Sequence, residues 1–322
     1  MKEIGGYFGL EEFSGKELYS DLIAVNSARN ALAYLIKARK IEKLYIPYYL
    51  CDSVSGVCDR EGCAYEYYNI GKDFKPIFDT QLESNEYLYV VNYFGQIDDC
   101  EIVSLKNKYE RVIFDNVQAF FREPIPGIDT VYSCRKFFGV PDGGYVSTDA
   151  LLDFSLQQDA SMNRMKHVLG RFEGDSASAY YKDFRENDDS FSTMPLCKMS
   201  KLTQNIMRAV DYEEARSIRE RNFALLDEKL GKYNGIGIKL TEGPYVYPFY
   251  CENGMEIKKK LAQNKIYVAT LWPEVIEMGQ ALERCFAENI LPLPCDQRYD
   301  SEDMMRVASL VLQLISLYGS EK

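Results

Sequence analysis

The sequence predicts an α/β fold with a mostly parallel central sheet, helices on both of its faces and a small α+β domain at the C-terminal end. Two observations predict it. Between Leu22 and Val146, short runs of β-branched and aromatic residues alternate with stretches whose apolar residues recur at helical spacing. Beyond Asn234-Gly235 this alternation stops, and longer helical stretches separate fewer strand-like runs.

The strands of the first half are expected where apolar, β-rich runs end at turn residues. Such runs lie at residues 43–46, 64–68, 86–91, 111–114, 130–133 and 144–147. Between them, helices are expected after Asn26-Ser27, from Ser53 onward and at residues 101–109. Parallel strands need such crossover connections, so this order of elements favours a parallel sheet.

The second half begins with a polar, irregular stretch at residues 150–195. One long amphipathic helix is predicted from Lys201 to about Leu230. Strands and helices of the small domain are then expected at residues 245–250, 256–263, 266–270 and 301–317. We therefore predict two domains, residues 1–198 and residues 199–322.

The composition argues against several kinds of partner. A formal net charge of -11 over 322 residues disfavours nucleic acid and anionic membrane surfaces, because both attract basic patches. No apolar run is long enough to cross a bilayer, and the first residues lack the pattern of a signal peptide, so we expect a cytoplasmic protein. Nine scattered cysteines and a single histidine, His167, predict reduced thiols and no metal site. We expect His167 to be a surface or loop residue.

Residues Ser27 to Leu32, Ser-Ala-Arg-Asn-Ala-Leu, open the first predicted helix. The unpaired N–H groups and the positive dipole at a helix start can bind a phosphate, which makes Ser27, Ala28 and Arg29 candidate ligand contacts. Taken alone, an ordinary helix cap explains Ser27 better.

Asp115 follows the strand predicted at residues 111–114. It stands at the carboxyl end of a strand, which is the edge where open α/β sheets bind ligands. A carboxylate there could keep a pyridine nitrogen protonated and make the ring an electron sink. A turn former or a helix cap is the commoner role of such an aspartate.

Lys136 lies among aromatic residues and glycines, between Tyr132 and Gly144. Such surroundings could remove its amine from water and leave it nucleophilic, whereas a lone loop lysine is otherwise solvated. The strand end at Asn92-Tyr93 offers planar side chains that could flank a ring, although aromatic core packing explains Tyr93 equally well.

The order and spacing of these segments resemble the DegT-type nucleotide-sugar aminotransferase family, which consists of fold-type-I enzymes dependent on pyridoxal 5'-phosphate (PLP). The likeness extends over nearly the whole chain. Asp-Asn-Val-Gln-Ala from Asp115 is similar to the family's Asp-x-x-Gln-Ala segment. Lys136 precedes Asp142-Gly143-Gly144 as the family lysine precedes its acidic residue and Gly-Gly pair. The segment from Ser27 resembles the family's phosphate turn, and the one from Asn92 its strand end beside the cofactor.

The resemblance implies a role for each of these residues. Lys136 would form the Schiff base with PLP and act as general acid and base, and Asp115 would pair with the pyridine nitrogen. Further cofactor contacts would come from Gln118, Ser27, Ala28, Arg29, Ser133 and Asn92.

Three positions depart from the family pattern. Cys51 stands where an aromatic side chain commonly stacks on the cofactor, so that a neighbouring tyrosine would have to replace it. Ser133 is closer to the lysine than usual, and Arg135 lies between them as a further candidate phosphate contact. Leu196 stands where relatives have an asparagine that reaches the phosphate of the neighbouring subunit. These differences indicate a divergent subgroup.

The implied reaction moves an amino group from an amino acid, commonly glutamate, to a keto sugar linked to a nucleotide, in surface polysaccharide or related sugar biosynthesis. Candidate substrate contacts are Tyr93, Lys198, Trp272 and Arg298, although Trp272 is equally well explained as a domain-packing aromatic. By analogy with fold-type-I enzymes, we expect a homodimer. The alternatives are a sugar dehydratase, whose relatives replace the lysine by histidine, a transaminase for another substrate, or a catalytically altered PLP-binding protein.

Overall fold

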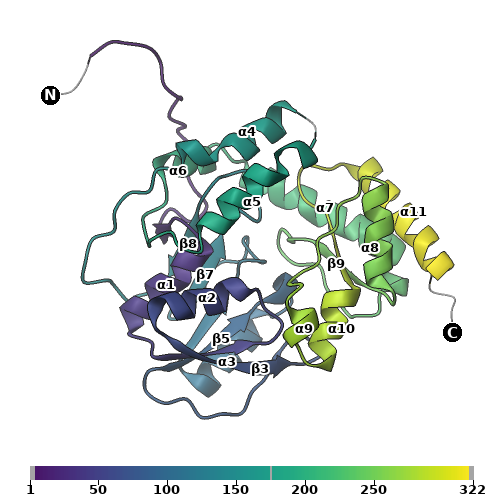
Figure 1. Ribbon diagram of the computed structural model, residues 1–322, viewed down its shortest axis with the longest axis horizontal. Coiled ribbons are helices and arrows are strands. Elements are labelled where there is room, and N and C mark those ends of the chain that lie inside the picture. Colours follow the sequence, from purple (N-terminus) through teal and green to yellow (C-terminus); the bar gives the residue numbers. More distant parts are fainter. Residues whose placement is uncertain (1–3, 175, 319–322) are drawn as a thin grey trace.

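The computed structural model of the chain describes residues 4–174 and 176–318. Its largest element is an eight-stranded sheet of order β1–β8–β7–β6–β5–β2–β3–β4 (Figure 1). The strands are β1 (Ile23–Val25), β2 (Lys43–Pro47), β3 (Ala64–Ile70), β4 (Pro76–Ile77), β5 (Glu86–Val91), β6 (Val112–Asp115), β7 (Asp129–Ser133) and β8 (Gly144–Ser147). The neighbouring strands from β7 to β3 in this order pair in parallel, whereas the pairs β1–β8, β7–β8 and β3–β4 are antiparallel. The mostly parallel sheet is therefore confirmed.

Helices surround this sheet and extend into a second region on the right of Figure 1. They are α1 (Ala28–Arg39), α2 (Asp52–Glu61), α3 (Asp99–Tyr109), α4 (Lys166–Glu173), α5 (Tyr181–Ser190), α6 (Lys201–Met207), α7 (Tyr212–Leu230), α8 (Gly254–Gln263), α9 (Val275–Met278), α10 (Ala281–Asn289) and α11 (Ser301–Tyr318). The second region contains a two-stranded antiparallel sheet of β9 (Tyr247–Tyr250) and β10 (Ile290–Leu293). With the helices around it, this sheet forms the α+β arrangement expected at the C-terminal end.

Both faces of the large sheet are buried. Successive strand residues point to opposite sides of a sheet, and here they enter two different apolar clusters. Val131 of β7 and Val146 of β8 belong to one apolar cluster, whereas their neighbours Tyr132 and Tyr145 belong to another. The first cluster includes side chains of α1 and α2, and the second includes side chains of α6 and α7. Helices therefore cover both faces, as predicted.

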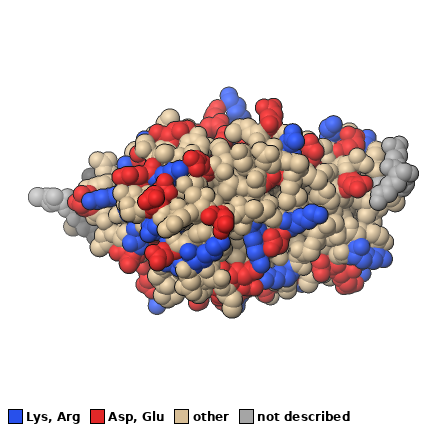
Figure 2. Space-filling model, turned by 90° about the horizontal axis from the view of Figure 1, so that it is seen from below, with Lys and Arg blue, Asp and Glu red and all other residues tan. Residues whose placement is uncertain are grey.

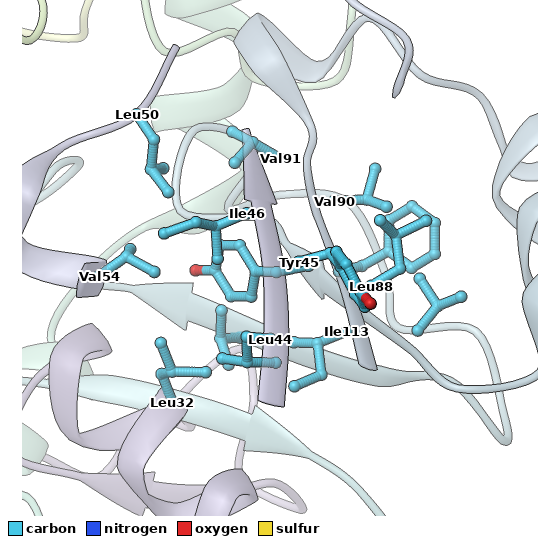
Figure 3. Close-up of a cluster of buried hydrophobic side chains, with 14 of the residues drawn as sticks. Leu32, Leu44, Tyr45, Ile46, Leu50, Val54, Leu88, Val90, Val91 and Ile113 are labelled. Atoms are coloured by element: carbon cyan, nitrogen blue, oxygen red, sulfur yellow. The ribbon is translucent and has the colours of Figure 1, made fainter. Parts of the chain in front are cut away.

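Figure 3 shows part of the first cluster, where α1 and α2 meet β2. Leu32 of α1 and Val54 of α2 lie beside Leu44 and Ile46, and all four side chains are at most 8% exposed. A further cluster joins α7, α8 and α11 to β9 and β10. Residues after 199 also enter the first cluster through Trp272, Phe286 and other side chains. The division into domains at residue 198 stays a prediction.

The stretch at residues 150–195, expected to be irregular, contains the helices α4 and α5. Their helical pattern is hard to recognise because apolar side chains remain on the outside: Leu169 is 53% exposed and Phe172 is 89% exposed. Polar contacts fix them instead, such as the 2.8 Å hydrogen bond from Asn187 Nδ2 to the carbonyl of Pro141. His167 accordingly lies on α4, half-buried, and desolvation lowers its pKa.

Two further predictions about the second half were wrong. The long helix expected at 201–230 is two helices, α6 and α7, because the Asp211 side chain accepts a hydrogen bond from the Glu214 N–H and starts a new helix. The run at 266–270 forms no strand in the described chain. It follows Lys265, which has a φ of 61°, and β9 is paired with β10 instead.

Charge is mixed on the molecular surface that Figure 2 shows. Basic and acidic side chains alternate over this face and do not gather into regions of one sign. No helix among the described residues is long and apolar enough to cross a membrane.

The start of α1 lies directly against β8. A Cβ atom at Gly144 would lie 2.7 Å from the carbonyl carbon of Ser27 and 2.8 Å from the amide nitrogen of Ala28. These distances are shorter than any ordinary contact, so only glycine allows this close approach. The second glycine of the Gly143-Gly144 pair therefore helps to place the N-terminus of α1.

We predict that Gly144→Ala lowers the free energy of unfolding by about 1–3 kcal/mol, because the added methyl group must push α1 away from β8. Denaturant unfolding measures this change. Gly56→Ala is the matched control: Gly56 lies in α2 with no atom within 4 Å of an added Cβ. There, alanine should stabilise by about 0.5–1 kcal/mol. Equal effects at both positions would contradict the proposed close approach.

Candidate active site

A cavity of about 430 Å³ lies at the carboxyl ends of the parallel strands. Its walls come from the start of α1, helix α2, the ends of β5, β6 and β7, the loops after β2 and β7, helix α5 and two loops of the C-terminal region. Nine residues singled out in the sequence line it: Ser27, Ala28, Arg29, Cys51, Asp115, Ser133, Arg135, Lys136 and Trp272. Two larger cavities, of about 650 and 620 Å³, lie elsewhere. Among the predicted site residues, only Arg298 lines one of them.

Asp115 lies at the end of β6 with only 3% of its surface exposed. One carboxylate oxygen accepts a 2.8 Å hydrogen bond from the Tyr89 hydroxyl, and the other accepts a 2.8 Å bond from the Val117 N–H. Desolvation raises the pKa of this carboxyl group, although the positive charge of Lys136 and the two hydrogen bonds oppose the shift. Asp115 is therefore a buried acid whose charge the chain only partly compensates.

Lys136 extends into the cavity from the loop after β7. Its ammonium nitrogen lies 5.7 Å from the ring centroid of Tyr245. The side chain is exposed, so the desolvation expected from its aromatic neighbours is not found. The reason is that Phe137 and Phe138 turn away into the cluster beneath the sheet, where they are 3% and 9% exposed.

Asp142 shows why an acidic residue precedes the glycine pair. Its fully buried carboxylate accepts a 2.8 Å hydrogen bond from the Ser200 N–H and bonds from the hydroxyls of Ser200 and Thr203. The next N–H, that of Gly143, donates to the Asn26 carbonyl at 2.9 Å. The lysine loop is thereby tied both to the start of α6 and to the segment before α1.

The start of α1 forms the cationic end of the cavity. Ser27 Oγ caps the helix by accepting a 3.1 Å hydrogen bond from the Asn30 N–H, so the ordinary cap is present. Arg29 and Arg135 both contact the carboxylate of Asp188, at 3.2 and 3.0 Å. Burial alone would raise the pKa of Asp188, but the two guanidinium groups outweigh it and lower the pKa.

Several residues that line the cavity were not predicted from the sequence. Asp188, Arg185 and Phe184 come from α5, in the stretch that was expected to be irregular. Tyr89 belongs to a correctly predicted strand, but no local pattern indicates that its hydroxyl reaches Asp115. Tyr245 follows a long loop from the C-terminal region, so only the tertiary structure brings it to Lys136.

Three predicted residues do not line the cavity. Asn92 is fully buried and donates to Asn116 Oδ1 at 3.0 Å, and the Tyr93 hydroxyl donates to the carbonyl of Tyr49. Gln118 accepts a 2.9 Å bond from the Phe94 N–H. Its buried Nε2 has no hydrogen-bond partner among the described residues.

Two predicted substrate contacts lie away from this cavity. Lys198 has an exposed side chain, and its backbone N–H bonds to the Gln157 carbonyl. Arg298 forms an ion pair with Asp296 at 2.7 Å and borders another hollow. Both residues lie in loops, and the conformation of a loop cannot be predicted from the spacing of residues along the chain. The sequence therefore did not show that their side chains lie away from the cavity.

The positions that depart from the family pattern have distinct environments. Cys51 lines the cavity, and desolvation raises the pKa of its thiol. Trp272 lines the cavity too, packed edge-on against Tyr49 with ring centroids 4.6 Å apart. The packing role considered for Trp272 is therefore found, and its contact with substrate stays a prediction. Leu196 packs against the first apolar cluster of its own chain.

The fold is that of solved sugar aminotransferases. A DegT/DnrJ/EryC1/StrS aminotransferase from Brucella abortus has a TM-score of 0.62 at 14% identity, over 91% of this chain and 85% of that one. The sugar aminotransferase Spr1654 from Streptococcus pneumoniae in its PMP form has a TM-score of 0.64 at 13% identity, over 92% and 88%. DesI, solved in the presence of its TDP-sugar product, has a TM-score of 0.64 at 15% identity, over 93% and 81%.

These likenesses confirm the fold expected from the resemblance to the DegT-type family. No protein-family model matches the sequence. A search of curated proteins found no match either. At identities of 13–15%, the shared feature is the arrangement of the backbone.

We predict that Asp115→Asn stabilises the cofactor-free protein at pH 7. The pKa of Asp115 is higher in the folded chain than its unfolded value of about 3.9, so its ionisation disfavours folding as pH rises through and above that value. The thermal unfolding midpoint should rise by about 2–4 °C for each kcal/mol relieved, and the gain should shrink toward pH 4.

Asp188→Asn is the matched control of opposite sign. The pKa of Asp188 is lowered on folding, so its charge stabilises the folded chain above the unfolded pKa, and this contribution is lost as pH falls through the folded pKa. The variant should be less stable than the natural protein at pH 7. A loss of stability in Asp115→Asn at pH 7 would show that its hydrogen bonds outweigh its desolvation.

Proposed function

We propose that this chain is a PLP-dependent aminotransferase that moves an amino group from an amino acid to a keto sugar. The observation that carries the proposal is the meeting of three groups in one cavity: the Lys136 amine, the buried Asp115 carboxylate, and the start of α1 with Arg29 and the neighbouring Arg135 of the lysine loop. PLP needs these three: an amine for its aldehyde, an acid for its pyridine nitrogen and a cationic site for its phosphate. The fold shared with sugar aminotransferases supports the proposal.

The residues present fit this cofactor at both ends of the cavity. Asp115 carries a desolvation cost that a protonated nitrogen beside it would relieve. At the other end, Arg29 and Arg135 already bind one anionic group, the Asp188 carboxylate.

Each residue then has a defined task. When bound, PLP supplies the electron sink that makes a proton on the amine-bearing carbon removable. Lys136 would hold the cofactor through its amine and, once the donor amine has displaced it, would remove that proton and return it at a neighbouring position. Asp115 would hold the pyridine nitrogen in its protonated form, and Arg29 and Arg135 would hold the phosphate. Trp272 forms part of the wall of the same cavity.

For the finer details, we propose glutamate as the amino donor and a nucleotide-linked keto sugar as the acceptor, within surface polysaccharide or related sugar biosynthesis. Arg185 supports an anionic acceptor, because this exposed residue lines the cavity and only Asp189 of its own helix pairs with it at 3.3 Å among the described acids. DesI, whose fold is similar, was solved in the presence of its TDP-sugar product, which is a nucleotide-linked sugar.

A second candidate is a PLP-binding protein without aminotransferase activity. Cys51, and not an aromatic ring, lines the cavity at the position where relatives commonly stack a ring on the cofactor. A sugar dehydratase is less well supported, because Lys136 stands where those relatives have histidine. A transaminase with a different acceptor would use the same lysine and aspartate.

We also propose that the protein forms a homodimer. The apolar residues Leu169 and Phe172 of α4 and Tyr181 of α5 are 53%, 89% and 60% exposed, and a second copy could cover them. The cytoplasmic location stays a prediction.

We predict that borohydride reduction of the protein with PLP leaves one stable adduct on Lys136, and that Lys136→Ala abolishes it. The reason is that Lys136 is the lysine that lines the cavity. Peptide mapping by mass spectrometry locates the adduct. Lys198→Ala, which removes an exposed lysine outside the cavity, should leave it unchanged. An adduct that persists in Lys136→Ala would refute the assignment.

We further predict that adding glutamate to the PLP-loaded protein converts the cofactor to its amine form, since the first half of the reaction needs only the donor. Absorbance spectroscopy follows the conversion, and Asp115→Asn should slow it by a factor of about 100 or more, because the pyridine nitrogen loses its acid partner. A loaded protein whose spectrum no amino acid changes would instead favour the PLP-binding protein without activity.

A further inference from the structure

Arg219 is a buried cation that the proposed reaction does not use. It lies on α7, is 1% exposed, and donates hydrogen bonds to the carbonyls of Phe137 at 3.2 Å and Pro244 at 2.9 Å, and to Gln297 Oε1 at 2.7 Å. Its guanidinium also lies 4.6 Å from the centre of the Phe137 ring. Desolvation lowers its pKa, while the charge of Asp296 opposes the shift.

A buried cation of this kind costs stability unless its donors are all satisfied. Three backbone carbonyls and the side-chain oxygen of Gln297 accept hydrogen bonds from its nitrogen atoms here. The planar guanidinium fixes these acceptors relative to one another because its donors have a rigid geometry. Phe137, whose carbonyl accepts one of these bonds, is the residue directly after Lys136. A weaker bond of 3.4 Å reaches the carbonyl of Tyr245, whose ring lies 5.7 Å from the Lys136 amine. One guanidinium therefore holds the lysine loop and the ring that faces the lysine.

Gln297 closes this arrangement from a third segment. Its Nε2 donates to the same Phe137 carbonyl at 2.8 Å, while its Oε1 accepts from Arg219. The Phe137 carbonyl thus accepts two hydrogen bonds, one from α7 and one from the segment between β10 and α11. Every donor comes from the C-terminal region, whereas Lys136 belongs to the loop after β7.

We propose that Arg219 and Gln297 are positioning residues for Lys136, which they aim into the cavity by holding the carbonyl of Phe137. The functional meaning of this position rests on the proposed role of Lys136 as the cofactor lysine. The contacts also couple the small C-terminal region to that lysine, so a displacement of β9, α7 or α11 changes the position of the amine.

Two variants test the proposal. Gln297→Glu keeps an acceptor for Arg219 but replaces the donor to Phe137 by an oxygen, and Arg219→Lys keeps the charge but loses the planar set of donors. The matched controls are Gln263→Glu at the exposed end of α8, and Arg221→Lys on the exposed side of α7, where the arginine contacts Asn222 and the Tyr299 carbonyl.

The measurement is the rate at which acetic anhydride acetylates Lys136 in the cofactor-free protein over a series of pH values, with exposed Lys201 as internal reference. Mass spectrometry of peptides gives both rates. We expect Gln297→Glu to change the Lys136 rate about threefold to tenfold and to alter its pH profile, as expected for the loss of one buried hydrogen bond. Lys201, and both control variants, should match the natural protein.

PLP gives an independent second readout: formation of the adduct on Lys136 should slow in the same two variants by a similar factor. An unchanged Lys136 acetylation profile in a folded Gln297→Glu protein would overturn the proposal, whatever the change in unfolding midpoint. If Arg219→Lys does not fold, Gln297→Glu decides alone. Because acetylation needs no cofactor, a protein that never binds PLP would refute the proposed function and still decide whether Lys136 is positioned in this way.

Discussion

The buried carboxyl group of Asp115 is the constraint on which the rest of the site depends. The chain keeps an acid at the end of β6, where desolvation opposes its ionised form. Two donors, the Tyr89 hydroxyl and the Val117 N–H, hold its oxygens and leave its charge only partly compensated. A buried ionisable group with incomplete compensation is more typical of a functional site than of a structural one. The parallel sheet is what makes the position possible, because β5, β6 and β7 all end at this edge.

The opposite end of the cavity is organised around anion binding within one chain. Asp188 of α5 lies between Arg29 and Arg135, so a carboxylate of the protein itself occupies the cationic site at the start of α1. The segment before Leu196 is also tied to α1, since the Pro195 carbonyl accepts hydrogen bonds from Asn26 and Asn30 at 3.1 and 2.9 Å. In relatives the asparagine at the position of Leu196 would serve a neighbouring subunit. Here α5 covers that end of the cavity from the same chain.

Much of this arrangement could be predicted from the sequence, and the limits have physical causes. The strands ending at Asp115 and Ser133 were predicted within one residue, because buried parallel strands read as short apolar runs between turns. The helices α4 and α5 were missed because tertiary ion pairs and hydrogen bonds, and not a buried apolar stripe, hold them. Lys136 was expected to be desolvated, yet its aromatic neighbours point into the core and leave it exposed.

Contacts between distant segments explain the residues that sequence patterns did not reveal. Tyr89, Arg219 and Gln297 each act on the site through one side-chain atom whose partner is decided by packing. Arg298 and Lys198 were chosen for charge alone, and the fold places them elsewhere. Motifs with a defined spacing, such as Asp142-Gly143-Gly144 after Lys136, were more informative, because each member has a separate steric or hydrogen-bonding reason.

A crystal structure of the protein grown with PLP tests the central claim most directly. The account predicts continuous density from the Lys136 amine to the cofactor, the pyridine nitrogen beside the Asp115 carboxylate, and the phosphate at the N–H groups that open α1, in contact with Arg29 and Arg135. Cofactor density that is joined to another lysine, or a phosphate bound away from the start of α1, would contradict it.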